Sequence, residues 1–209
     1  MENGHLTQNT EKRLMIVSGQ GYPELAERIA DRLDMDLSGV ELVKFPGGEL
    51  YARYLESVRG ADVFIIQSLC EPVNENLMQL LIMIDAAKRA SAKRIVAVIP
   101  WYAYSRQDRK TKPREPITAR LVANMIQAAG AERVMTMDLH TGQIEGYFTF
   151  PVDHLTAMHT FVDYFVEQGF KDAEDAVVED RRQGFAVLLA QLAPVEDADA
   201  SPRHLPQCS

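Results

Sequence analysis

The chain has few cysteines and no long apolar run, and both absences limit what it can be. Its 209 residues include only Cys70 and Cys208, which lack the CxxC spacing of a metal or redox site. We interpret both as free thiols. No stretch approaches the roughly 18 to 20 apolar residues of a membrane span. The first 13 residues also lack the apolar segment of a signal peptide. We therefore expect a cytoplasmic protein that contacts no membrane.

Two common nucleotide-binding motifs are also absent. The sequence contains neither GxxxxGK[ST] nor GxGxxG, so a bound nucleotide would not be held by a P-loop or a Rossmann fingerprint. The formal net charge of −8 and the pI of about 5.2 disfavour a nucleic-acid-binding domain. With 46% apolar residues, the chain has ample material for the core of one large or two small domains.

The apolar pattern predicts strands and helices in alternation. We expect buried strands at residues 13–18, 62–68, 94–100 and 133–138, and helices at residues 23–33, 74–90 and 117–130. Two shorter β segments, 40–45 and 50–54, flank a Pro-Gly-Gly turn and predict a hairpin or flap. Such an order is typical of an α/β fold with a mainly parallel sheet and helices on both faces. Ligands of these sheets bind at the carboxyl ends of the strands.

One loop concentrates positive charge in this acidic chain. The stretch YSRQDRKTKPREP, residues 104–116, holds five basic side chains, and its two prolines disfavour a helix. Trp101, Tyr102 and Tyr104 precede the charges, so flat surfaces and cations share one mobile loop, as a nucleotide's base and phosphates require. The alternatives are a solvated surface arm and a nucleic-acid contact, and the acidic composition disfavours the second.

A second polar loop, DLHTGQIEG, follows the strand expected at residues 133–138. Asp138 and His140 lie one residue apart there and can both turn toward a shared ion or phosphate. Alternatively, His140 caps the next helix or packs against Tyr147. Asp153 and His154 add two candidates, although Asp153 could equally be the N-cap of a helix expected within residues 155–169.

Taken in order, these segments resemble the amino-terminal part of the ribose-phosphate diphosphokinase, or phosphoribosyl pyrophosphate synthetase, family. The resemblance runs from about Leu14 to about Gly169 and includes PELAERIA, VRGADVFIIQS, RQDRK with PREPITARLVA, and DLHTGQIEGYFTFPVD. It implies a phosphoribosyltransferase-like, ATP-binding domain over residues 13–170 with a small β flap, preceded by a flexible N-terminus at residues 1–12.

The resemblance also implies a reaction and its participants. In this family the 1-hydroxyl of ribose 5-phosphate attacks the β-phosphorus of magnesium-bound ATP, and AMP leaves. Mg²⁺ is then the implied cofactor, with ATP and ribose 5-phosphate as substrates. The implied ATP contacts are Phe45, Gly47, Gly48, Glu49, Arg106, Gln107 and His140. The implied catalytic lid residues are Arg109 and Lys110, and the implied metal-associated residues are Asp138, His140 and Asp153.

The sequence departs from the family pattern at three positions. Gly47 stands where the family's flap has Asp, which removes one acceptor for the adenine amine. Thr149 stands where the family often has Asp, and Glu145 replaces the usual Gln, so one acid of an auxiliary cation site is missing. Because the family's flap reaches the site of a neighbouring subunit, the resemblance implies a homo-oligomer or association with a full-length homologue.

The family's second domain has no visible counterpart in this sequence. Its Ser-Pro-Asp metal segment, catalytic lysine and Thr-Gly-rich sugar-phosphate loop are missing, and Lys171 is the last lysine. We expect residues 171–209 to form a divergent, truncated and partly disordered tail. Two hypotheses follow. The chain is either a ribose-phosphate diphosphokinase that acts in nucleotide biosynthesis, or a noncatalytic homologue that binds nucleotide or modulates a full-length partner.

Overall fold

A computed structural model describes residues 13–167 of the chain, so the expectations for residues 1–12 and 171–209 lie outside the described part. Its elements are β1 (Leu14–Ser18), α1 (Pro23–Arg32), β2 (Val40–Lys44), β3 (Leu50–Tyr54), β4 (Asp62–Ile66), α2 (Val73–Arg89), β5 (Arg94–Ile99), α3 (Thr118–Ala129), β6 (Arg133–Met137), the 3-10 helix η1 (Gly142–Tyr147), β7 (Val152–Leu155) and α4 (Met158–Glu167). The strands and helices predicted between residues 13 and 138 are all confirmed.

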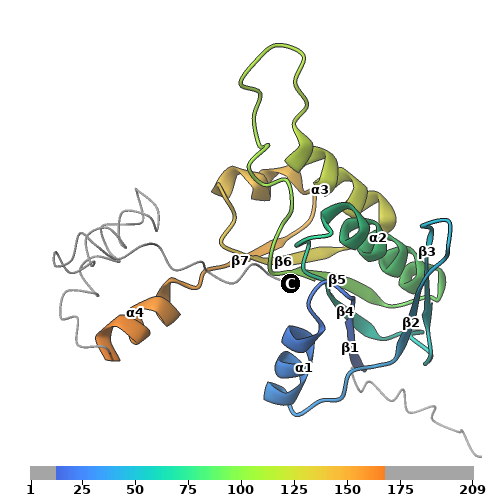
Figure 1. Cartoon of the computed structure of the whole chain (residues 1–209). Helices are drawn as coiled ribbons and strands as arrows, with labels where there is room; N and C mark the ends of the chain where they lie inside the picture. The colour runs from blue at the N-terminus through green and yellow to red at the C-terminus, as the bar shows by residue number, and fades with distance from the viewer. Residues whose placement is uncertain (1–12, 168–209) are drawn as a thin grey trace, which may run out of the picture. The chain divides into compact units, whose positions relative to one another are not determined.

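Five of the strands form one mainly parallel sheet in the order β1-β4-β5-β6-β7. The pairs β1–β4, β4–β5 and β5–β6 are parallel, which confirms the predicted fold class. Helix α1 lies on one face of this sheet, and α2 and α3 cover the other (Figure 1). Because the strands run in parallel, the loops that follow β5 and β6 leave from the same edge.

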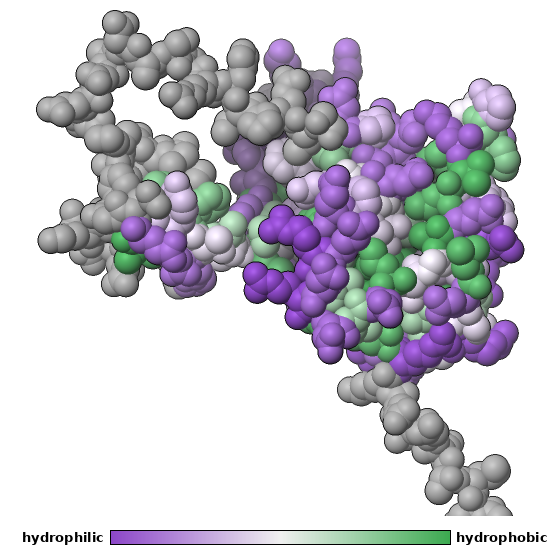
Figure 2. Space-filling model, turned by 60° about the horizontal axis from the view of Figure 1, so that its bottom comes forward, coloured by the Kyte–Doolittle hydropathy of each residue, from purple (hydrophilic) through white to green (hydrophobic). Residues whose placement is uncertain are grey.

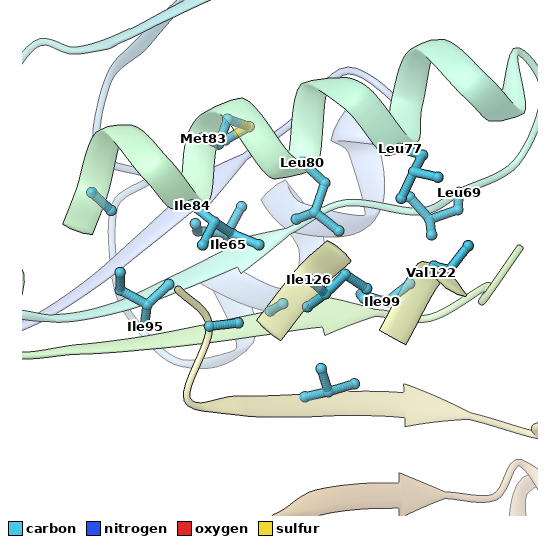
Figure 3. Close-up of a cluster of buried hydrophobic side chains, with 14 of the residues drawn as sticks. Ile65, Leu69, Leu77, Leu80, Met83, Ile84, Ile95, Ile99, Val122 and Ile126 are labelled. Carbon is cyan, nitrogen blue, oxygen red and sulfur yellow. The ribbon is translucent and has the colours of Figure 1, made fainter. Parts of the chain in front are cut away.

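The main core lies between the sheet and helices α2 and α3. Leu77, Leu80 and Ile84 recur at helical spacing on α2 and point toward Ile65 and Ile99 of the strands (Figure 3). Leu80 is fully buried, and a Leu→Ala change at such a site costs about 2–5 kcal/mol of stability. This packing holds α2 against the sheet, with the amino-terminal end of the helix at the carboxyl edge of the strands.

The predicted hairpin is also confirmed. Strands β2 and β3 pair antiparallel, and the hydroxyl of Tyr54 donates a hydrogen bond of 3.0 Å to the backbone oxygen of Met83 on α2. Burial raises the pKa of this tyrosine above its ordinary value. The open end of the hairpin, where Val40 pairs with Tyr54, is thus anchored to α2. The turn at residues 45–49 lies at the opposite end of the hairpin.

The sequence did not predict two elements, η1 and β7. Strand β7 includes Asp153, and helix α4 begins only at Met158, whose N–H donates to the hydroxyl of Thr156 at 3.2 Å. The alternative in which Asp153 is the N-cap of the following helix is therefore wrong. The chain divides after His154 into two units, and α4 belongs to the second.

The surface carries apolar side chains among polar ones, as the face drawn in Figure 2 shows. Leu33, Leu55 and Trp101 are each more than half exposed. Within residues 13–167, none of the helices combines the length and apolar character that crossing a membrane requires.

Candidate active site

The two polar loops meet at one edge of the sheet. Strands β5 and β6 pair in parallel with Ile99 opposite Thr136, and each is followed at once by one of the loops. The aromatic and basic segment begins at Trp101, and the Asp-Leu-His segment begins at Asp138. Their predicted position at the carboxyl edge is confirmed.

A cleft of about 840 Å³ opens between these loops and the start of α2. It is lined by residues 71–75, 101–107 and 137–140. Four predicted site residues are therefore together in it: Arg106, Gln107, Asp138 and His140. The volume lies within the roughly 300–1,000 Å³ that is usual for small-molecule sites.

The backbone is strained at two points of the cleft wall. Tyr104 has φ of 60° and Asp138 has φ of 45°, in the left-handed region that costs a non-glycine residue about 1–2 kcal/mol. The hydroxyl of Tyr104 donates a hydrogen bond to the side-chain oxygen of Asn74 on α2, which joins two parts of the cleft wall. Strained backbone of this kind concentrates at functional sites.

The base of the basic loop is fixed at Gln107 and Asp108. The side-chain oxygen of Gln107 accepts a hydrogen bond of 2.6 Å from the hydroxyl of Thr118 at the start of α3. Asp108 is only 4% exposed, and its Oδ2 accepts hydrogen bonds from Thr141 at 2.8 Å and Gln143 at 2.6 Å. The basic loop and the segment after β6 are therefore joined directly.

The outer part of the basic loop is closed by a local turn. One carboxylate oxygen of Glu115 accepts hydrogen bonds from the backbone N–H groups of Thr111 and Lys112, at 2.9 and 2.8 Å, and from the Thr111 hydroxyl at 2.8 Å. These bonds, the one from the Lys112 N–H first, lower the pKa of Glu115 below its ordinary value. Arg109 and Lys110 lie between this turn and Asp108, are exposed, and do not line the cleft.

His154 holds the Asp-Leu-His segment through the backbone of Leu139. Its Nε2 accepts a hydrogen bond of 3.0 Å from the backbone N–H of Leu139. Its Nδ1 lies 2.7 Å from Oε1 of Glu145. Since Nε2 is an acceptor, a neutral ring carries its proton on Nδ1 and donates it to the Glu145 carboxylate. Glu145, one of the departures from the family pattern, therefore has a local partner.

Asp153 lies apart from the other two predicted metal-associated residues. Both of its carboxylate oxygens accept hydrogen bonds from Nη1 of Arg133, at 2.7 and 2.8 Å. Among residues 13–167, no group of three or more His, Cys, Asp or Glu side chains is arranged to hold a metal ion. Of the three predicted metal-associated residues, Asp138 and His140 line the cleft and Asp153 does not.

The predicted flap residues form the turn of the β2–β3 hairpin. The N–H of Phe45 donates to the backbone oxygen of Glu49, and the N–H of Gly48 donates to that of Phe45, both at 2.8 Å. Gly48 has φ of 89°, a conformation that favours glycine. Neither these residues nor Gly47 line the cleft. The hairpin reaches α2 through an ion pair of 2.6 Å between Lys44 and Glu75.

Sequence reasoning missed two residues that shape the site, Asp108 and Thr141, and did not predict the contacts of a third, His154. The basic stretch that contains Asp108 was interpreted from its cations alone, and its donors Thr141 and Gln143 lie 33 and 35 residues further along the chain. His154 was noticed, but its support of Leu139 depends on β7 and could not be read from spacing.

Comparison with known proteins identifies relatives of this chain. The family model for the N-terminal domain of ribose phosphate pyrophosphokinase matches residues 14–130. The ribose-phosphate pyrophosphokinase of Clostridium perfringens is 57% identical over 171 residues, which cover 82% of this chain and 54% of the relative. The enzyme of that name from Mycobacterium leprae is 50% identical over 170 residues, covering 81% and 52%.

A solved structure agrees with these sequence matches. The crystal structure of phosphoribosylpyrophosphate synthetase from Mycobacterium smegmatis aligns with a TM-score of 0.73 and 49% identity, over 75% of this chain and 52% of that one. The fold is therefore phosphoribosyltransferase-like, as predicted. The chain spans about half the length of the curated relatives it matches. On these matches, the chain belongs to the ribose-phosphate pyrophosphokinase family.

Proposed function

We propose that the cleft binds Mg-ATP and that the chain provides the ATP-binding part of a ribose-phosphate diphosphokinase. In that reaction diphosphate passes from ATP to ribose 5-phosphate, which gives phosphoribosyl diphosphate and AMP. The observation that carries the proposal is the meeting of Arg106 and Gln107 with Asp138 and His140 in one cleft. Cations, amides and metal donors then face the same ligand, as a polyphosphate requires.

The two sides of the cleft have different tasks in this proposal. The guanidinium of Arg106 offers several donors in a fixed plane and binds phosphate oxygens through charge-assisted hydrogen bonds. Trp101 and Tyr104 line the cleft beside it and offer flat surfaces for a base. Gln107, held through Thr118, supplies a positioned amide.

The donors in the cleft fit a metal ion that arrives with the nucleotide. Mg²⁺ usually keeps several waters and binds through one or two carboxylates together with substrate phosphates. Asp138 and His140 suit that arrangement, and Asp153 would join them only if it left Arg133. When bound, the ion would supply charge neutralisation between phosphate oxygens.

Arg109 and Lys110 are proposed to act as the catalytic lid. Both are exposed and lie outside the cleft, just beyond the anchored Asp108. A short rotation of the loop beyond Asp108 would bring their charges toward bound phosphates and exclude water there. Their contribution is then to stabilise negative charge during diphosphate transfer.

The hairpin turn is proposed to serve a neighbouring copy of the chain. Phe45 is 46% exposed, and its ring lies 6.3 Å from that of Tyr51, so an aromatic pair faces solvent at the turn. Residues 45–49 do not line their own cleft. An oligomer in which the turn reaches the adenine site of a second copy would use both features.

Calorimetric titration of the purified 209-residue chain with ATP and Mg²⁺ tests the proposal. Replacing Arg106 with Ala removes charge-assisted bonds worth about 1.5–3 kcal/mol, so affinity should fall roughly 10- to 150-fold. Arg89→Ala is the matched control, because Arg89 lies at the other end of α2, about 24 Å along the helix from Val73. Equal losses in both variants, or no binding by the wild type, would overturn the proposal.

AMP formation from ATP with ribose 5-phosphate and Mg²⁺ then separates the enzyme from a noncatalytic homologue. Sugar-dependent AMP that His140→Ala abolishes supports a complete diphosphokinase. Binding of ATP without AMP, restored to activity only by adding a full-length relative, supports a nucleotide-binding partner instead.

A further inference from the structure

Asp108 interrupts the basic loop with a carboxylate that points away from solvent. It stands between Gln107 and Arg109, yet it is 4% exposed. Its Oδ2 accepts hydrogen bonds from the Thr141 hydroxyl at 2.8 Å and from the Gln143 amide at 2.6 Å. The hydroxyl of Tyr147 also donates to its backbone oxygen.

All three donors come from the segment that follows His140. Thr141 precedes η1, and Gln143 and Tyr147 belong to it. This contact therefore connects a residue two positions after Arg106 with a residue one position after His140. A buried carboxylate is costly unless it is hydrogen-bonded, and the hydrogen bonds from Thr141 and Gln143 compensate it. The hydrogen bond from Thr141 first, and that from Gln143, lower the pKa of Asp108 below its ordinary value.

We propose that Asp108 is a positioning residue that couples the two sides of the cleft, so that Arg106–Gln107 and Asp138–His140 engage a nucleotide together. This inference rests on the proposed function, because the coupling is defined by a shared ligand. Asp108 itself does not line the cleft and is not assigned a contact with substrate. Its action passes through the Thr141–Gln143 segment.

A double-mutant cycle read by fluorescence tests the coupling. Trp101 is the only tryptophan of the chain and lines the cleft, so its emission reports Mg-ATP binding. Dissociation constants are measured for the wild type, Arg106→Ala, His140→Ala and the double variant. Contacting or networked residues couple by about 2- to 150-fold in affinity, and we expect a factor within that range.

The same four measurements are repeated in the Asp108→Ala background. The coupling factor should fall to within about twofold of unity. If Asp108→Ala does not fold, the measurement uses Asp108→Asn, which keeps one acceptor for the hydroxyl of Thr141. Asp85→Asn is the control for charge, since Asp85 forms an exposed ion pair with Arg89 on α2, and it should leave the coupling factor unchanged.

A readout without nucleotide separates positioning from general destabilisation. Asp108→Ala should raise the hydrogen-exchange rates of the backbone amides in both segments, residues 105–112 and residues 139–147. Glu115→Ala removes the hydrogen bonds that close the local turn of the same loop, so it should raise the exchange rates only within residues 111–115. Acceleration of just one of the two segments in Asp108→Ala would overturn the proposal.

The outcomes distinguish this inference from the proposed function. Absence of any Mg-ATP binding by the wild type overturns the proposed function, and the coupling with it. Binding with a coupling factor that survives Asp108→Ala shows that the ligand alone links the two sides, and overturns only the positioning role.

Discussion

Replacing His154 with Ala should lower both the stability of the fold around the cleft and the affinity of the cleft for Mg-ATP. His154 accepts a hydrogen bond from the N–H of Leu139 at 3.0 Å, and its Nδ1 lies 2.7 Å from Glu145. Leu139 stands between Asp138 and His140, both of which line the cleft. Loss of its backbone anchor would weaken the hold on this segment of the cleft wall.

The magnitude follows from the two bonds and their exposure. A neutral hydrogen bond contributes about 0.5–1.5 kcal/mol. The side chains of His154 and Glu145 are 26% and 43% exposed, so their contact is valued as a partly solvated pair, at about 0.2–1 kcal/mol. Together these give a loss of about 0.7–2.5 kcal/mol in the free energy of unfolding.

Urea unfolding of the 209-residue chain measures this loss. Glu145→Gln keeps an acceptor for Nδ1–H and should cost less than about 0.5 kcal/mol, whereas His159→Ala, an exposed histidine of α4, should cost nothing measurable. Mg-ATP affinity should fall about three- to tenfold in His154→Ala alone. A His154→Ala variant as stable as the His159→Ala control would show that the contacts of His154 with Leu139 and Glu145 do not stabilise the fold.

Two further predictions concern backbone packing and acid stability. A Cβ on Gly21 would lie 2.2 Å from the backbone oxygen of Ser68, so Gly21→Ala should lower the free energy of unfolding by at least about 2 kcal/mol, as measured by thermal unfolding. A Cβ on Gly47 would have nothing within 4 Å, so Gly47→Ala should stay within about 0.5 kcal/mol of the wild type. Asp108 has its pKa lowered by hydrogen bonds, first from Thr141, below the ordinary value of 3.8. A carboxyl with a lowered folded-state pKa contributes stability above its unfolded pKa and loses it as pH falls through the folded pKa. The stability difference between wild type and Asp108→Asn, followed by urea unfolding against pH, should therefore be constant above about pH 5 and shrink below about pH 4; a difference that grows on acidification would contradict this assignment.

The sequence predicted the sheet because its strands are continuous apolar runs separated by amphipathic helices. Residues 62–68 and 94–100 are short apolar runs typical of buried strands, and parallel pairing then brought the loops after β5 and β6 to one edge. The meeting of Arg106 with His140 in one cleft followed from that topology rather than from any local motif.

The missed features depend on contacts between distant parts of the chain. Asp108 is buried by donors 33 and 35 residues further on, which no local pattern indicates. Strand β7 has only four residues and includes Asp153 and His154, so it lacks the apolar alternation of a strand. Pairing of Asp153 with Arg133 requires β6 and β7 to be neighbours in the sheet, and this order was not predicted.

A crystal structure of the chain with Mg²⁺ and a nonhydrolysable ATP analogue would show whether this cleft is the nucleotide site. We expect density for the triphosphate in the cleft between residues 101–107 and 137–140, with a phosphate oxygen within hydrogen-bonding distance of Arg106. A nucleotide bound elsewhere on the chain, with this cleft empty at saturating concentration, would contradict it.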